Sequence, residues 1–184
     1  MADINIVVLN GASCSGKTTL ARELQLTFRE PYLRFGTDTV HSMLPTRIAG
    51  GKKTQNEHIV RTAVLGMHRC AATFADAGNN VIVDTVMLNR ESVVECAHTL
   101  ASYRAFFVGL FCGDDELRRR ASDRGGDMVN ISLQQARYVH TYSIYDLKIN
   151  TEGKPPSVMA EQVRNLVNSR MKPEAFKRLN GQYT

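Results

Sequence analysis

The chain lacks tryptophan, has few prolines and contains no long apolar run. Among its 184 residues there are 5 prolines and 4 cysteines, and 7% are aromatic. No window approaches the roughly 18 consecutive apolar residues that a membrane-spanning helix needs, so we expect no membrane segment. The first apolar stretch contains Asp3 and Asn5 and leads into a glycine turn, which does not fit a secretory signal peptide.

Cysteine and histidine are too scattered to indicate a metal site or a disulfide framework. None of them forms a close pair with the spacing of metal ligands, and a chain of this size can fold without disulfides. We therefore expect the cysteines to be small apolar residues in a reducing, cytoplasmic setting. The residues are Cys14, Cys70, Cys96 and Cys112, and His41, His58, His68, His98 and His140.

Positive charge is in mild excess over negative charge. Lysine and arginine number 23 against 18 aspartates and glutamates, which gives a formal net charge of +5. That charge suits an anionic ligand, but it is too small and too dispersed to indicate nucleic acid. The missing tryptophan also removes one residue type on which bases stack. A hydrophobic content of 43% and the length of the chain are typical of one globular domain.

Five short apolar runs predict buried strands. Most of them are continuous and do not alternate with polar residues, which is typical of a parallel sheet covered on both faces. The runs are INIVVL (4–9), YLRF (32–35), NVIVD (80–84), RAFFVGLFC (104–112) and DLKIN (146–150).

Helical patterns lie between these runs, as one-sided apolar stripes with helical spacing. SLQQ (132–135) also has the pattern of a capping box that begins a helix. Alternating strands and helices predict right-handed βαβ units and a three-layer α/β sandwich. Segments 45–54 and 124–131 have the composition of loops. We assign one domain to residues 1–170 and a polar, basic, mobile tail to residues 171–184.

Residues 11–18, GASCSGKT, form the pattern G-x-x-x-x-G-K-T between the first predicted strand and a predicted helix. This strand–turn–helix context identifies a P-loop. The glycines let the backbone curl so that successive N–H groups face one anion, and the helix adds its positive amino-terminal end. We therefore predict that the phosphates of ATP are held by Gly11, Ala12, Ser13, Cys14, Ser15, Gly16, Lys17, Thr18 and Thr19.

Four side chains have more specific predictions, three in the P-loop and one at the end of a later strand. The Lys17 ammonium is expected to reach the β- and γ-phosphates, and the Thr18 hydroxyl to bind Mg²⁺. Asp84 ends the run NVIVD and suits the shell of the same ion, or it caps the next turn. Cys14 is either sensitive to redox conditions or simply small enough to fit the loop.

Two further features follow the second and fourth predicted strands. Asp38 could deprotonate an acceptor hydroxyl or cap the short helix TVHSML (39–44). The run RRRASDRGGD (118–127) could be a mobile flap that closes over the triphosphate or a solvated helix face. Consecutive arginines on a helix cannot all point the same way, so Arg120 and Arg124 are predicted to be the inward pair.

With these motifs in place, the chain resembles the chloramphenicol phosphotransferase-like family of P-loop kinases. The resemblance covers about residues 5–151, and FGTD with a following short helix and YDLKINT narrow it beyond the P-loop superfamily. The segments that carry it are IVVLNGASCSGKT, EPYLRFGTDTVHSMLP, NNVIVDTVML, FVGLFCGDDELRRRASDRGGD and QARYVHTYSIYDLKINT.

The resemblance implies a kinase-type strand order with the P-loop strand in the centre, and phosphorylation of a small-molecule hydroxyl by ATP with Mg²⁺. It further implies that Asp38 is the general base and that Arg120 and Arg124 belong to a short arginine-rich lid at about 118–132. The loop after Asn150 would then form part of the adenine pocket. The acceptor, an antibiotic such as chloramphenicol among the candidates, stays open. So do two alternatives: a nucleoside, nucleotide or polynucleotide-end kinase, and a nucleotide-gated binding protein.

Overall fold

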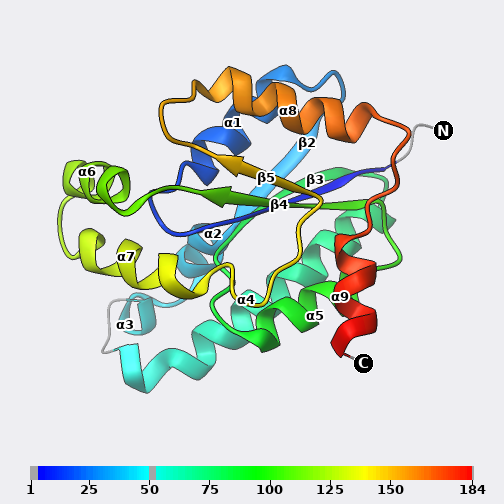
Figure 1. Ribbon diagram of the computed structural model, residues 1–184. Coiled ribbons are helices and arrows are strands. Elements are labelled where there is room, and N and C mark those ends of the chain that lie inside the picture. Colours follow the sequence, from blue (N-terminus) through cyan, green and yellow to red (C-terminus); the bar gives the residue numbers. More distant parts are fainter. Residues whose placement is uncertain (1–3, 50–52, 184) are drawn as a thin grey trace.

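The five strands of the computed structural model, which describes residues 4–49 and 53–183, form one parallel sheet. The strands are β1 (Ile6–Asn10), β2 (Tyr32–Gly36), β3 (Asn80–Thr85), β4 (Ala105–Phe111) and β5 (Leu147–Asn150). Their order is β2-β3-β1-β4-β5, and β1 pairs in parallel with both β3 and β4 (Figure 1). This arrangement confirms the predicted α/β sheet with kinase-type strand order and a central P-loop strand.

Helices cover both faces of the sheet and make the three layers (Figure 1). One face carries α1 (Lys17–Thr27) and α8 (Pro156–Asn168), and the other carries α4 (Lys53–Asp76), α5 (Arg90–Leu100) and α9 (Ala175–Tyr183). Alternate residues of β1 enter different cores, because successive side chains of a strand point to opposite faces. Val7 and Leu9 pack with α1 and α8, whereas Ile6 and Val8 pack with α4, α5 and α9.

Four further helices lie toward the carboxyl ends of the strands (Figure 1). α2 (Thr37–Met43) begins directly after β2 and is followed by α3 (Thr46–Ala49). α6 (Asp114–Arg124) and α7 (Met128–Tyr138) follow β4 and pack on each other. A third apolar cluster, which includes Ala12, Leu117 and Val139, joins this helix pair to the P-loop.

Two predicted loops are shorter than expected. Gly125 and Gly126, with φ of 75° and 63°, end α6, and α7 then starts at Met128, so the break between helices spans only residues 125–127. The predicted start of a helix at SLQQ is wrong, because Ser132 lies within α7 and is fully buried. In the other predicted loop, residues 46–49 are helical, residues 53 and 54 belong to α4, and residues 50–52 lie outside the described part of the chain.

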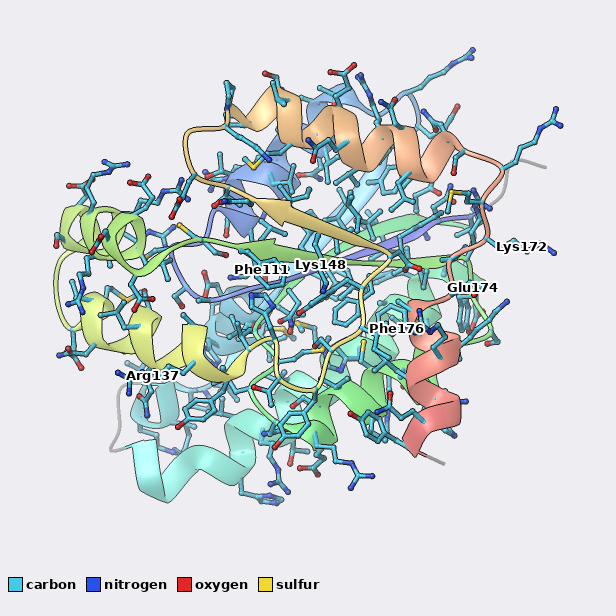
Figure 2. All side chains as sticks on the ribbon, in the orientation of Figure 1. Phe111, Arg137, Lys148, Lys172, Glu174 and Phe176 are labelled. Atoms are coloured by element: carbon cyan, nitrogen blue, oxygen red, sulfur yellow. The ribbon has the colours of Figure 1, made fainter. Side chains whose placement is uncertain are left out.

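The expected mobile tail is also wrong for residues 175–183, which form α9. Ala175, Phe176 and Leu179 are buried in the core with α5 and β4. The Phe176 ring stacks on Phe107 of β4 with ring centroids 4.7 Å apart, and Figure 2 shows Phe176 on the side of α9 that faces the sheet. Within residues 4–49 and 53–183, no helix combines the length and apolar character needed to cross a bilayer.

Candidate active site

The P-loop follows β1 and leads into α1, a helix whose amino terminus has no side-chain cap. Gly16 is the N-cap of α1 with φ of 96°, no side chain caps this end, and the first turn of the helix contains no acid. The first amides of a helix have no partner within the helix. An open amino terminus of this kind attracts anions through its N–H groups and its partial positive charge.

The glycine that begins the P-loop is required by close packing. A Cβ on Gly11 would lie 2.7 Å from the Leu110 carbonyl oxygen of β4, closer than atoms can approach. Cys14, in contrast, has φ of 62°, which makes it a non-glycine residue in the left-handed region. Cys14 is 8% exposed and lines a cavity that the P-loop forms with residues at or after the ends of β2, β3 and α6, so the loop has a strained, sulfur-bearing position at its tip.

The pKa of Lys17 is shifted by burial and by neighbouring charges. Its side chain is 7% exposed, and its Nζ donates a hydrogen bond to the Ala12 carbonyl at 2.9 Å. Burial lowers the pKa of the Lys17 ammonium below its usual value, whereas the nearby carboxylates of Asp84 and Asp38 raise it in part. Lys17 is therefore a desolvated cation held among two carboxylates, and a phosphate would compensate it further.

Thr18 and Asp84 are in direct contact. The Thr18 hydroxyl donates a hydrogen bond of 2.6 Å to one Asp84 carboxylate oxygen, and the other oxygen lies 3.9 Å from Lys17 Nζ. Both side chains offer oxygen atoms to the same cavity, and oxygen is the ligand type that Mg²⁺ prefers. No group of three or more histidine, cysteine, aspartate or glutamate side chains that could hold a metal is found among the described residues. The pair thus suits an ion that a nucleotide also coordinates.

Asp38 reaches the cavity because β2 packs closely on β3. A Cβ on Gly36 would lie 2.2 Å from the Asp84 carbonyl oxygen, so only glycine permits this approach at the ends of the two strands. Asp38 then lies in the first turn of α2, is exposed and lines the same cavity as Lys17 and Thr18. The hydroxyl of the neighbouring Thr37 is buried without a hydrogen-bond partner.

The two predicted lid arginines have different surroundings. Arg124 lines the cavity with the P-loop. Arg120 lies close to Gly16, because its Nη1 is 3.6 Å from the position that a Cβ on Gly16 would occupy. Its guanidinium is already hydrogen-bonded to other residues of the protein. It donates to the Glu116 carboxylate at 2.7 Å and to the Thr151 carbonyl at 2.9 Å. The structure therefore brings Arg124 into the cavity and leaves Arg120 at its margin.

The cavity itself has a volume of about 410 Å³ and joins four segments of the chain. It includes most of the predicted P-loop residues together with Asp38, Asp84 and Arg124. Several lining residues were not predicted as site residues, because neither spacing nor composition gives any of them a chemical role. These are Arg34, Gly36, Thr37, Thr39, Val86 and Met128.

A hydrogen-bond network that the sequence analysis did not identify supports the P-loop. Asn10, the last residue of β1, is fully buried and donates from Nδ2 to the Val139 carbonyl at 2.9 Å and to the Tyr145 hydroxyl at 2.8 Å. Its Oδ1 accepts from the Met87 amide at 2.9 Å. In addition, Gln135 of α7 accepts from the Ser13 amide at 2.7 Å. These bonds join the P-loop, the loop after β3 and the end of α7.

This sheet order and P-loop define the fold of the P-loop kinases. The structure of the APS kinase CysC of Mycobacterium tuberculosis in complex with AMPPNP and APS superposes with a TM-score of 0.71, at 18% identity over 91% of this chain and 99% of that one. A shikimate kinase of Acinetobacter baumannii in complex with shikimate gives a TM-score of 0.54, at 16% identity over 90% of this chain and 93% of that one. At such identities the likeness shows the fold alone.

The chain belongs to the family described as chloramphenicol phosphotransferase-like protein, whose model matches residues 4–168. A curated relative from Mycobacterium tuberculosis is named "Putative O-phosphotransferase Rv2636". The two sequences are 26% identical in an alignment of 204 residues, which covers 100% of this chain and 91% of the relative. The resemblance seen in the sequence is thereby confirmed at the level of the family.

Proposed function

We propose that the protein transfers the γ-phosphate of ATP to a hydroxyl group of a small molecule. The observation that carries this proposal is that the P-loop, Lys17, Asp84 and Arg124 share one cavity of about 410 Å³ with the carboxylate of Asp38. A cavity of this size is within the range of small-molecule sites. Family membership supports a phosphotransferase, and the solved kinases with APS and with shikimate support a small acceptor.

In this mechanism the P-loop residues bind and orient the triphosphate, and Lys17 offsets the charge of the β- and γ-phosphates. Asp38 accepts the proton of the acceptor hydroxyl as that oxygen bonds to the γ-phosphorus. The bond between the γ-phosphorus and the β–γ bridging oxygen breaks, and ADP leaves with the electron pair. Arg124 stabilises charge on the transferred group, and the α6–α7 pair keeps water from the γ-phosphate.

Thr18 and Asp84 would hold Mg²⁺ together with the phosphates, because their oxygen atoms face the cavity side by side. The ion supplies charge neutralisation of the β- and γ-phosphate oxygens when it is bound. Thr151 and the loop after it would form the adenine pocket with Arg120, whose guanidinium contacts this residue. Chloramphenicol is one candidate acceptor, and antibiotic resistance is the corresponding candidate role.

Asp38→Asn tests the proposed base. We expect the variant to bind ATP within about twofold of the wild type and to lose about 10²- to 10⁴-fold in acceptor phosphorylation. Glu161→Gln is the matched control, because it makes the same carboxylate-to-amide change at an exposed position of α8. Equal turnover of the acceptor by wild type and Asp38→Asn would remove Asp38 from the mechanism.

The acceptor itself is found by measuring ATP consumption with antibiotics, nucleosides and metabolite alcohols, with mass detection of an added phosphate. A phosphorylated small alcohol supports the proposal. If ATP binds normally and the whole panel yields no phosphorylated product, the protein is better described as a nucleotide-gated binding protein.

A further inference from the structure

A second large concave surface lies at the end of the sheet opposite to the P-loop. We call it the basal groove: most residues of the segments 27–32 and 164–172 line it together with Asn5, Asn80 and Arg104, and its volume is about 880 Å³. The amino ends of β1 to β4 and the carboxyl ends of α1 and α8 surround it. Because β1 alone spans about 17 Å, the groove is separate from the active-site cavity. Figure 2 places Lys172 at the end of the molecule away from α6 and α7.

The basal groove has a strong excess of positive charge. Its lining contains five basic side chains and one carboxylate, Glu30, whereas the net charge of the whole chain is only +5. None of the five basic side chains forms an ion pair with a described residue. The basic residues are Arg29, Arg104, Arg164, Arg170 and Lys172.

Local structure explains only part of this charge. Arg104 is committed to the fold, since it donates to Asn5 Oδ1 at 2.8 Å and to the Val167 carbonyl at 2.9 Å. Arg164 makes one long contact of 3.5 Å to the Thr27 carbonyl. The ends of α1 and α8 each contribute roughly half a negative charge. The two helix ends together therefore offset about one of the four excess positive charges in the groove.

Three cations stay available to a ligand. Arg29, Arg170 and Lys172 are exposed and have no hydrogen-bond or ion-pair partner among the described residues. A concave wall focuses their field and raises the local concentration of anions. Planar guanidinium groups match phosphate oxygens in pairs, so the groove has the charge and the donors for adjacent phosphate groups.

The geometry points to a compact polyphosphate ligand: we propose that the basal groove binds a small molecule with two or more linked phosphate groups. A single-stranded nucleic acid binds best where its bases can stack on exposed aromatic rings beside the basic side chains. Here Tyr32 is 7% exposed and Phe28 is stacked on it with centroids 4.2 Å apart, so neither ring forms an open platform. Outside the groove the remaining positive and negative charges nearly balance in number, so most of the net positive charge of the chain lies in the groove.

Calorimetric titration with inorganic tripolyphosphate tests the proposal. The titration is done in a Lys17→Ala background, which weakens binding at the P-loop and leaves the basal groove intact. We expect about one equivalent to bind, and the added change R29Q/R170Q to weaken this binding at least about tenfold. The matched control K177Q/R178Q removes two exposed charges from α9 and should change the affinity less than about twofold. Circular dichroism checks that each variant is folded.

Two outcomes overturn the proposal. One is that the Lys17→Ala protein does not bind tripolyphosphate, or binds it equally well with R29Q/R170Q. The other is that a short single-stranded RNA binds more tightly than tripolyphosphate through the same arginines, which would make the groove a nucleic-acid surface. ATP as a third ligand distinguishes a free nucleotide from inorganic polyphosphate. None of these results bears on acceptor phosphorylation, so the proposed function is tested separately.

Discussion

At the scale of single residues, the surroundings of His140 keep its imidazole neutral. Its ring stacks on Phe111 with centroids 3.8 Å apart, and its Nδ1 lies 2.7 Å from the Tyr145 hydroxyl. Burial, and to a smaller extent the charges of Lys148 and Lys17, lower the pKa of His140 to about 4, although a hydrogen bond with the Leu110 backbone acts in the opposite direction. The imidazole therefore stays neutral in the folded protein under conditions in which an unfolded histidine is protonated.

This difference predicts a loss of stability in mild acid. Between its ordinary pKa of 6.5 and about 4, the unfolded chain binds a proton at His140 that the folded chain does not. Stability therefore falls as the pH falls through this window. Because the ring is partly exposed, we expect its share of the loss between about pH 7 and pH 5 to be only about 1 kcal/mol. Urea unfolding at both pH values measures it, with His140→Gln losing less than the wild type. An equal loss in both proteins would contradict the assignment.

Single residues also show where the sequence analysis stops. The P-loop could be predicted because its chemistry is local: the glycines, Lys17 and Thr18 adjoin in the chain and form one pattern. Asp84 and Asp38 could be proposed because both follow predicted strands whose ends meet at one sheet edge. Asn10 could not be identified, because its three hydrogen-bond partners come from residues far along the chain. The helical pattern favoured Arg120 and Arg124 together, but Arg120 is held by Thr151, a contact that only the fold reveals.

At the scale of elements, the strands were predictable and two helices were not. Most of the strands are continuous apolar runs because both faces of a parallel sheet are buried, and such runs are visible in a sequence. α9 was mistaken for a tail because its surroundings in the chain are polar and only three of its residues are buried: Ala175, Phe176 and Leu179. α7 begins earlier than the SLQQ pattern indicates, because Ser132 is buried within the helix instead of capping it.

The packing of α9 gives a prediction for this element. Phe176 is 2% exposed and stacks on Phe107 in the core beneath the sheet. Phe176→Ala should lower the free energy of unfolding by about 3–4 kcal/mol, because it leaves a cavity under β4. The exposed neighbour Lys177 supplies the control, since Lys177→Ala should stay within about 0.5 kcal/mol of the wild type. Urea titration measures both variants, and a loss below about 1 kcal/mol for Phe176→Ala would mean that α9 is not part of the core.

At the scale of the whole molecule, the parallel sheet separates two anion-attracting regions. The open amino end of α1 lies at the P-loop, and the carboxyl end of the same helix lies at the basal groove. The sequence could not indicate the groove, because its five basic residues come from three separated segments of the chain and form no run. The parallel βα topology brings them together, because it places the amino ends of the strands and the carboxyl ends of the helices at the same edge of the sheet.

The same topology predicts how the whole domain responds to its nucleotide. A ligand that binds only the folded state at 100 times its Kd stabilises that state by about 2.7 kcal/mol. For a domain of this size the melting temperature should rise by about 5–10 °C. We expect the rise with ATP and Mg²⁺ to be clearly larger than with ATP and EDTA, because Thr18 and Asp84 would contact the nucleotide through the ion.

Asp84→Asn should remove most of this difference between magnesium and EDTA, because the amide no longer offers the ion a charged oxygen. Asp115→Asn, an exposed change on α6, should keep the full difference. Differential scanning fluorimetry of the three proteins gives the comparison. If wild type and Asp84→Asn respond equally to magnesium, Asp84 does not belong to the ion's shell. The contact between Thr18 and Asp84 would then serve only to hold β3 against α1.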